Sequence, residues 1–370
     1  MTKGGNSRRP VHRRLWIPFV AVVLTVVALS VALGPALGLR HDSSPGASLL
    51  TVHFIDVDQG DATLIQGEDV VILIDAGRHD RNDVVPYLRS VGVTSIDLLV
   101  GTHPHADHIG QFPSVLREFD VKEVWLSGDE TTTRTFENAI DAILASDAAY
   151  HEPRAGEQFQ FGSVTIEVIH PEEINGDLNN GSIGLRLKYG DVAFLFTGDA
   201  EAEAELSMIA RGHDLRADVL HVGHHGSRTS SSRDFLVAVN PRIAVYSAGK
   251  DNSYGHPHRE VLALLSSLGI NVYGTDVHGT IKITTDGKTI RVKTEKDGAS
   301  TGPCGPGQVD INTAPADELV RIIHVGPALA GAIISGRPYS SVDDLIRVSG
   351  IGEARLQAIK DQGIACAGAA

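Results

Sequence analysis

Apolar and polar positions divide the chain into an N-terminal apolar run, a long mixed region and a short helical region. Residues 15–39 carry no charge and directly follow a cluster of basic residues. About 20 apolar helical residues span the hydrocarbon core of a bilayer, and flanking basic residues stay on the cytoplasmic side. We therefore expect a cytoplasmic segment at 1–14, one transmembrane anchor at 15–39 and an exported remainder. A cleaved signal peptide, which would leave a secreted protein, is the alternative.

Residues 49–294 follow a polar linker at 40–48 and alternate strand-like runs with helical runs. Runs such as DVVILIDAG, SVTIEVIH and VAFLFTGD are rich in apolar and β-branched residues and bounded by turn residues, as in strands. Apolar residues recur with helical spacing near residues 82–91, 132–146, 201–211 and 258–268. The pattern predicts one large α/β domain.

Residues 308–366 follow a Gly- and Pro-rich linker at 295–307 and have a helical pattern throughout. Thr313 is suited to cap the first helix. Two turns that contain glycine, HVGP at 324–327 and GIGE at 350–353, each separate two short helical runs. The pattern predicts a small all-α domain built from two helical hairpins.

Charge is unevenly distributed along the chain. The 46 acidic and 32 basic residues give a formal charge of −14, which divides into +5 for residues 1–14 and −19 for the remainder. Because the remainder is so acidic, it cannot bind nucleic acid through a general electrostatic attraction to the phosphates. The 17 histidines and 2 cysteines exclude Cys-rich zinc modules, so a metal site would need histidine and carboxylate ligands.

The two cysteines, Cys304 and Cys366, flank the C-terminal helical region. In an oxidising compartment they could pair and join the ends of this domain. We expect this disulfide; two unrelated thiols are the alternative.

Three groups of metal-binding residue types each follow an apolar, strand-like run: THPHADH at 102–108, TGD at 197–199 and GHHGS at 223–227. Folds of the α/β class place their chemistry at strand ends. Burying so many ligand-type side chains without a partner would be costly. A solvent-exposed histidine-rich loop is the alternative for the first group.

HxHxDH, followed by a strand-terminal GD and a strand-terminal GH, resembles the metallo-β-lactamase superfamily. The resemblance implies a four-layer αβ/βα sandwich with two divalent metal ions, zinc or manganese, between the sheets. It also implies a catalytic role for Asp107. The ligands it implies are His103 and His105 for the first ion, Asp107, His108 and His224 for the second, and Asp199 as the bridge.

One position departs from the superfamily pattern. The segment DLNNGS at 177–182 stands where a further histidine usually binds the first ion. We expect Asn180 to substitute for it, with help from Ser182, and His170 is an alternative ligand. An amide oxygen in place of a nitrogen would weaken zinc there and favour manganese or magnesium.

Four further segments resemble the exported lactamase-like domain of ComEC competence proteins: IDVDQGDA at 55–62, LNNGS at 178–182, HHGS at 224–227 and NSYGHP at 252–257. That family takes up DNA, and the resemblance implies degradation of the strand that is not transported. We expect His225 and His256 near the metals as catalytic groups, with a structural role as the alternative. Asp75 is expected to order the metal loop. Asp58 stands where the family has glycine, so a positive φ there would be mildly strained.

The C-terminal region resembles a tandem helix-hairpin-helix domain of the ComEA type, a non-sequence-specific DNA binder. Glycine-rich turns expose backbone N–H groups at a helix N-terminus, and these bind phosphate without net positive charge. His324 stands where the family has glycine in the first hairpin. The DNA-binding residues expected from this resemblance are Val325, Gly326, Gly350, Ile351 and Gly352, with Arg355 and Lys360 as auxiliary contacts. A domain that only packs against a protein is the alternative.

The sequence therefore predicts an exported, membrane-anchored, metal-dependent hydrolase that binds DNA, a nuclease or phosphodiesterase of competence and DNA uptake. One membrane helix cannot form a channel, so transport would require a separate channel partner. The alternatives are a hydrolase of a small ester, lactone or amide, and a non-catalytic extracellular DNA-binding protein.

Overall fold

A computed structural model describes residues 48–174, 176–296, 308–312, 314–337, 339 and 341–367. The expected cytoplasmic segment, the expected anchor and nearly all of both expected linkers lie outside these residues, as do Thr313 and Cys304. Within these ranges, no helix is long and apolar enough to cross a membrane.

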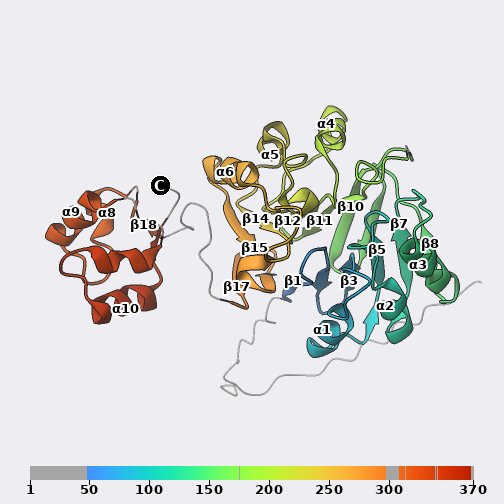
Figure 1. The fold of residues 1–370 in the computed structure, drawn as a ribbon, viewed down its shortest axis with the longest axis horizontal. Helices are drawn as coiled ribbons and strands as arrows, with labels where there is room; N and C mark the ends of the chain where they lie inside the picture. Colours follow the sequence, from blue (N-terminus) through green and yellow to red (C-terminus); the bar gives the residue numbers. More distant parts are fainter. Residues whose placement is uncertain are drawn as a thin grey trace, which may run out of the picture. The chain divides into compact units, whose positions relative to one another are not determined.

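Two sheets, each part antiparallel and part parallel, enclose a buried core in residues 48–296 (Figure 1). The eight-stranded sheet has the spatial order β17 (Ile290–Thr294), β16 (Ile281–Thr285), β1 (Leu50–Phe54), β2 (Thr63–Gln66), β3 (Val71–Ile74), β5 (Leu98–Gly101), β7 (Glu123–Leu126) and β8 (Ala149–His151). The seven-stranded sheet has the order β15 (Asn271–Gly274), β14 (Ile243–Tyr246), β13 (Val219–His221), β12 (Val192–Phe196), β11 (Gly184–Tyr189), β10 (Val164–His170) and β9 (Gln158–Phe161). A separate two-stranded sheet pairs β4 (Ser95–Ile96) with β6 (Asp120–Val121).

Buried and more exposed side chains alternate along the strands, and this pattern explains why the two sheets pack together. In β16, Ile281 and Ile283 are fully buried, whereas Lys282 between them is only partly buried, because successive strand residues point to opposite faces. Phe54 in β1 meets Phe196 in β12 across the core, with ring centroids 6.3 Å apart. Burying one such side chain stabilises the fold by about 2 kcal/mol, so the inner faces hold the two sheets together.

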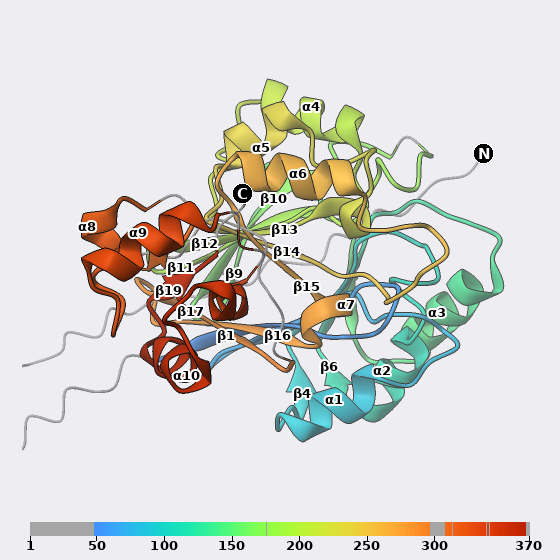
Figure 2. The ribbon, with the colours of Figure 1, turned by 60° about the vertical axis from the view of Figure 1, so that its left-hand side comes forward.

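Helices cover the outer face of each sheet (Figure 2). The eight-stranded sheet packs against α1 (Val84–Ser90), α2 (Phe112–Glu118) and α3 (Arg134–Leu144), and the seven-stranded sheet against α4 (Ala202–Ala210), α5 (Arg233–Val239) and α6 (Arg259–Ser267). A short helix, α7 (Thr275–His278), joins β15 to β16. The expected αβ/βα layering is confirmed.

The expected helical runs coincide with α1, α3, α4 and α6, each slightly shorter than its run. Helix α5 was not predicted, because its seven residues hold too few apolar repeats to show a helical period. Strand β9 was also missed; its exposed polar residues alternate with half-buried ones, so it lacks a buried run.

Residues 308–367 form a small domain with its own apolar core. Its elements are β18 (Val309–Asp310), α8 (Ala316–Leu319), α9 (Pro327–Ser335), the 3₁₀ helix η2 (Val342–Arg347), α10 (Glu353–Gln362) and β19 (Ala365–Cys366). Strands β18 and β19 pair in parallel and join the two ends of the domain, which the helical pattern did not predict. Cys366 is disulfide-bonded.

Candidate metal centre

Three loops that follow buried strands meet beside one another. Strand β5 leads into residues 102–108, β12 leads into Asp199, and β13 leads into the 3₁₀ turn η1 (Gly223–Gly226). The backbone N–H of His224 donates to the carbonyl of Gly198 at 3.0 Å, which ties two of the loops together. Gly198 has a φ of +52°, and a Cβ atom there would lie 2.8 Å from the Thr102 side chain. Only glycine permits this approach.

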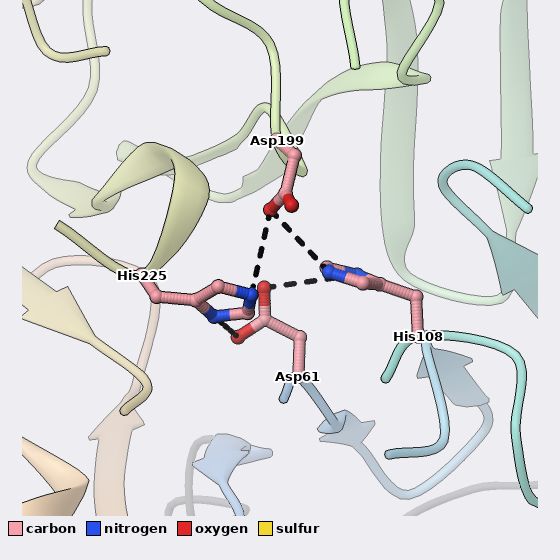
Figure 3. Close-up of side chains that lie close together, drawn as sticks. All are labelled: Asp61, His108, Asp199 and His225. Atoms are coloured by element: carbon pink, nitrogen blue, oxygen red, sulfur yellow. Dashed lines mark ion pairs between the residues drawn. The ribbon is translucent and has the colours of Figure 1, made fainter. Parts of the chain in front are cut away.

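Figure 3 shows four buried side chains, Asp61, His108, Asp199 and His225, each with a ligand atom within 4.8 Å of the others. His108 Nε2 lies 3.4 Å and His225 Nε2 3.8 Å from Asp199 Oδ1. Asp107 Oδ2 lies 3.4 Å from His225 Nε2. Two ligand atoms that share a tetrahedral ion at about 2.1 Å stand roughly 3.4 Å apart. His108, His225, Asp107 and Asp199 therefore have the spacing of ligands around one ion, whereas Asp61 lies on the Nδ1 side of both rings.

Hydrogen bonds on the far side of each ring fix the two histidines of this group. His108 Nδ1 lies 2.8 Å from Asp75 Oδ2, and His225 Nδ1 lies 3.0 Å from the carbonyl of Ser247. Because a carboxylate and a carbonyl accept hydrogen bonds, each Nδ1 donates and each Nε2 presents a lone pair. Among the described residues, Nε2 of His108, Nε2 of His225 and Oδ1 of Asp199 are buried without a hydrogen-bond partner. Such facing acceptors are costly unless a cation lies between them.

Carboxylates dominate the electrostatics of this group. Against the effect of burial, Asp199 and Asp75 raise the pKa of His108 well above its ordinary value. His225 and His108 likewise hold the pKa of Asp107 well below its usual range, again against the effect of burial. The site thus attracts positive charge. The 3.4 Å from His108 Nε2 to Asp199 Oδ1 exceeds a charge-assisted hydrogen bond of about 2.8 Å, which favours a metal ion over a proton.

A second group shares Asp199 and contains His103 and His105. His103 Nε2 lies 3.5 Å from Asp199 Oδ2 and 2.9 Å from His105 Nδ1. His103 Nδ1 lies 3.2 Å from the Thr102 hydroxyl, so its Nε2 is again the nitrogen that faces the carboxylate. The two oxygens of Asp199 therefore face different histidines.

The structure distributes the two consecutive histidines of η1 differently from the sequence prediction. The prediction placed His224 with the second ion and gave His225 a catalytic role. Instead, His225 joins His108, whereas His224 Nε2 lies 3.7 Å from Asp199 Oδ2, the oxygen that faces His103. Thr229 and Glu201 contact His224 Nδ1 at 3.3 and 3.4 Å, so this ring too turns Nε2 toward the carboxylate.

Asn180, the expected substitute ligand, uses its side chain elsewhere. Its Oδ1 accepts hydrogen bonds from the backbone N–H groups of Glu201 and Ala204, at the start of α4, and its Nδ2 donates to Asp177. His170, the alternative ligand, contacts the Asn180 carbonyl at 2.6 Å. Ser182 Oγ accepts from the Asp199 backbone N–H at 3.1 Å. The structure brings none of their side chains into either group.

Two aspartates support the histidines from behind. Asp75 accepts hydrogen bonds from the backbone and the hydroxyl of Thr102 and contacts His108, so its predicted ordering role is confirmed. Asp61 had no predicted role, yet it is 3% exposed, and its Oδ1 lies 3.4 Å from His221 Nε2 and 3.7 Å from His225 Nδ1. Its place in the segment IDVDQGDA at 55–62, which resembles the competence proteins, was the available signal. Asp58 in the same segment has a φ of +62°, so it adopts the mildly strained left-handed backbone considered for this position.

A cavity of about 350 Å³ opens beside the two groups and is lined by His105, Asp107, Asp199, His224, His225 and His256, together with Gln59, Pro104, Ala106, Thr133 and Tyr254. His256 stacks over His225 with ring centroids 6.1 Å apart. Burial, with further contributions from His225 and His224, lowers the pKa of His256 to about 4. The cavity gives a substrate access to both ligand groups.

The helical hairpins of the C-terminal domain leave two glycines in open space. Gly326 and Gly352 precede α9 and α10 with φ values of −93° and −97°, which any residue can adopt, and a Cβ atom there would meet nothing within 4 Å. The described part of the fold therefore does not require glycine at either position. His324 and Gly350, at matching places in the two hairpins, both have positive φ, 63° and 95°.

The other expected DNA contacts lie close to these glycines. Val325 and Ile351 are buried in the domain core, so only their backbones are available to a ligand. Arg355 donates to the Gly350 carbonyl, and Lys360 pairs with Asp343 at 2.8 Å. These two basic side chains are partly engaged within the domain.

Comparison with known proteins connects both parts of the chain to recognised families. The profile of the metallo-beta-lactamase superfamily matches residues 55–250, and that of the helix-hairpin-helix motif matches residues 306–362. A deoxyribonuclease of Thioalkalivibrio sp. (strain K90mix) is 47% identical over 60 residues, which cover 16% of this chain and 17% of that protein.

Two competence proteins match over longer stretches. ComE operon protein 3 of Bacillus subtilis is 32% identical over 251 residues, which cover 62% of this chain and 32% of that protein. Competence protein ComA of Neisseria gonorrhoeae is 32% identical over 290 residues, which cover 72% of this chain and 38% of that protein. The chain thus spans about a third of the length of these relatives, and the resemblance to competence proteins is confirmed.

Proposed function

The chain belongs to the metallo-β-lactamase superfamily, and on this premise we propose that it is a metal-dependent nuclease that cleaves phosphodiester bonds in DNA. One observation carries the proposal. Asp199 turns Oδ1 toward His108 and His225, and Oδ2 toward His103, so one carboxylate links two cation sites. When bound, a pair of divalent ions, zinc or manganese, supplies an activated water and neutralises charge at a phosphate.

The chain's own residues hold and orient the reacting groups. Asp75 and the Ser247 carbonyl fix the rings of His108 and His225, so each Nε2 faces the shared carboxylate without rearrangement. His256 lines the cavity beside His225, and the two rings stack with centroids 6.1 Å apart. We assign His256 to a hydrogen bond with an oxygen of the substrate phosphate.

The C-terminal domain would supply DNA affinity that the acidic chain cannot obtain from bulk charge. The open backbone at Gly326 and Gly352 can receive a phosphate without sequence preference. We further propose that the apolar run at 15–39 anchors the protein, that both domains act outside the cytoplasm in DNA uptake, and that a separate channel carries the transported strand. The competence proteins among its relatives support this setting.

The decisive experiment incubates the full chain, stripped of metal by a chelator, with single- and double-stranded DNA. Manganese, zinc or magnesium is then added to separate samples. We expect cleavage that appears with a metal ion and disappears again on chelation. DNA binding without cleavage under every metal would show a receptor. A chain that neither binds nor cleaves DNA would overturn the proposal and favour a hydrolase of a small ester, lactone or amide.

Gly352→Val is expected to weaken DNA binding about tenfold, because a side chain there would occupy the space in which a phosphate meets the backbone. The substitution suits the extended backbone of Gly352, so the free energy of unfolding should stay unchanged. Fluorescence anisotropy of a labelled oligonucleotide measures the affinity. Gly331→Ala, in α9 of the same domain, is the control, since a Cβ atom there also meets nothing. Equal affinity in both variants would contradict this role for the second hairpin.

A further inference from the structure

Tyr254 is an exposed aromatic side chain at the edge of the catalytic cavity. It is 65% exposed, yet it lines the same cavity as Asp107 and Asp199. A large ring left in water gives up the stabilisation that its burial would provide. Its position beside the metal centre therefore calls for a ligand that covers it.

The loop that carries Tyr254 is held in place by one side chain. Asn252 Oδ1 accepts hydrogen bonds from the backbone N–H groups of Tyr254 and His256, both at 3.1 Å. Asn252 Nδ2 donates to the carbonyls of Gly249 and His256. These hydrogen bonds hold the turn that carries the exposed ring in one conformation. Less conformational entropy is therefore lost when a ligand binds.

Three rings form a continuous stack from the metal centre to the surface. His256 stacks on His225 with an interplanar angle of 29°. Tyr254 in turn stacks on His256, with ring centroids 5.7 Å apart and an angle of 23°. Among the described residues, His256 is the ring that contacts Tyr254, and the other face of the tyrosine continues the stack toward solvent.

We propose that Tyr254 is a stacking platform for a nucleobase of single-stranded DNA whose phosphate enters the cavity. This inference rests on the proposed function and names the form of its substrate. Among the described residues, none that lines the cavity is a lysine or an arginine, so the rim offers a flat aromatic face rather than a positive charge. Every base has a π-face that can stack on such a ring. In a duplex both faces are already covered by neighbouring bases, so the platform selects unpaired strands.

The test measures cleavage of a single-stranded oligonucleotide by the full chain with manganese or zinc. Tyr254→Ala is expected to raise KM about tenfold, the scale of one stacked base, with kcat within about twofold of wild type. Tyr254→Phe keeps the ring and should behave like wild type. Tyr150→Ala removes another exposed tyrosine, 48% exposed in β8, and should also behave like wild type.

An abasic oligonucleotide identifies the base as the partner of the ring. Wild type should lose about tenfold in kcat/KM when the base beside the scissile phosphate is missing, whereas Tyr254→Ala should lose almost nothing. The proposal is overturned if Tyr254→Ala matches wild type on the normal strand, or if Tyr254→Phe is as defective as Tyr254→Ala.

Binding separates this inference from the proposed function. Fluorescence of a 2-aminopurine oligonucleotide, recorded with a chelator present, should be quenched by wild type and by Tyr254→Phe but not by Tyr254→Ala. If wild type cleaves no DNA, the proposed nuclease fails, and the quenching still decides whether Tyr254 stacks a base. If wild type cleaves DNA but quenching is equal in all three proteins, the stacking platform fails and the nuclease stands.

Discussion

Asp199→Asn is expected to bind neither metal ion tightly and to lose hydrolysis by ~10⁴-fold or more. Asp199 contributes one oxygen to each ligand group, at 3.4 Å from His108 Nε2 and 3.5 Å from His103 Nε2. An amide keeps one oxygen and carries no charge, so it cannot serve both groups. It would also place a hydrogen-bond donor against an imidazole nitrogen.

Metal content distinguishes this effect from a general loss of structure. Elemental analysis of the purified full chain should give two ions in wild type and none in Asp199→Asn, while circular dichroism stays unchanged. Asp129→Asn is the matched control, because Asp129 is a buried carboxylate that belongs to neither ligand group. Two ions retained in Asp199→Asn, with full activity, would refute the shared-carboxylate arrangement.

The sequence contained enough information to place the loops that carry the two candidate ligand groups. The motifs at 102–108, 197–199 and 223–227 each follow an apolar run, and strand ends in α/β folds meet at one edge. Asp75 could also be anticipated, because it closes a buried strand beside the first of these loops. Local pattern and layer architecture together therefore located the site.

Backbone conformation determines which oxygen of Asp199 each of the two consecutive histidines faces, and the sequence did not reveal this. His224 and His225 have φ values of 51° and 55°, a left-handed turn that sends adjacent rings to different ligand groups. A motif with two consecutive histidines does not reveal which ring faces which oxygen. Asp61 escaped notice for a similar reason, because its contacts with His221 and His225 join residues distant in sequence.

In the C-terminal domain, the glycines of the two hairpin turns were the sequence signal that predicted the DNA contacts. Gly326 and Gly352 have ordinary φ values and open surroundings, so the turn itself does not explain why glycine stands there. His324 adopts a positive φ of 63° without being glycine, and the motif comparison had anticipated a departure at this position. The first hairpin thus keeps its shape at some cost in backbone strain.

His224→Ala and Asn180→Ala together test which residue completes the group of His103 and His105. His224→Ala should retain one ion tightly and bind the other about 100-fold more weakly, because His224 Nε2 faces Asp199 Oδ2. Hydrolysis should fall by about 10³-fold, since both ions act on one phosphate. Asn180→Ala should keep both ions, because the Asn180 amide bonds the backbone of Glu201 and Ala204 instead.

The two variants should rank in the opposite order in their free energy of unfolding, with Asn180→Ala the more destabilised. Asn180→Ala leaves two backbone N–H groups at the start of α4 without their acceptor, at a cost of about 1–2 kcal/mol in the free energy of unfolding. His224 is partly exposed, so His224→Ala should change the unfolding free energy of the metal-free chain by less. Denaturant unfolding with a chelator present, alongside metal titration calorimetry, measures both quantities. Loss of an ion in Asn180→Ala, with two ions retained in His224→Ala, would restore Asn180 as the ligand and assign His224 to the substrate.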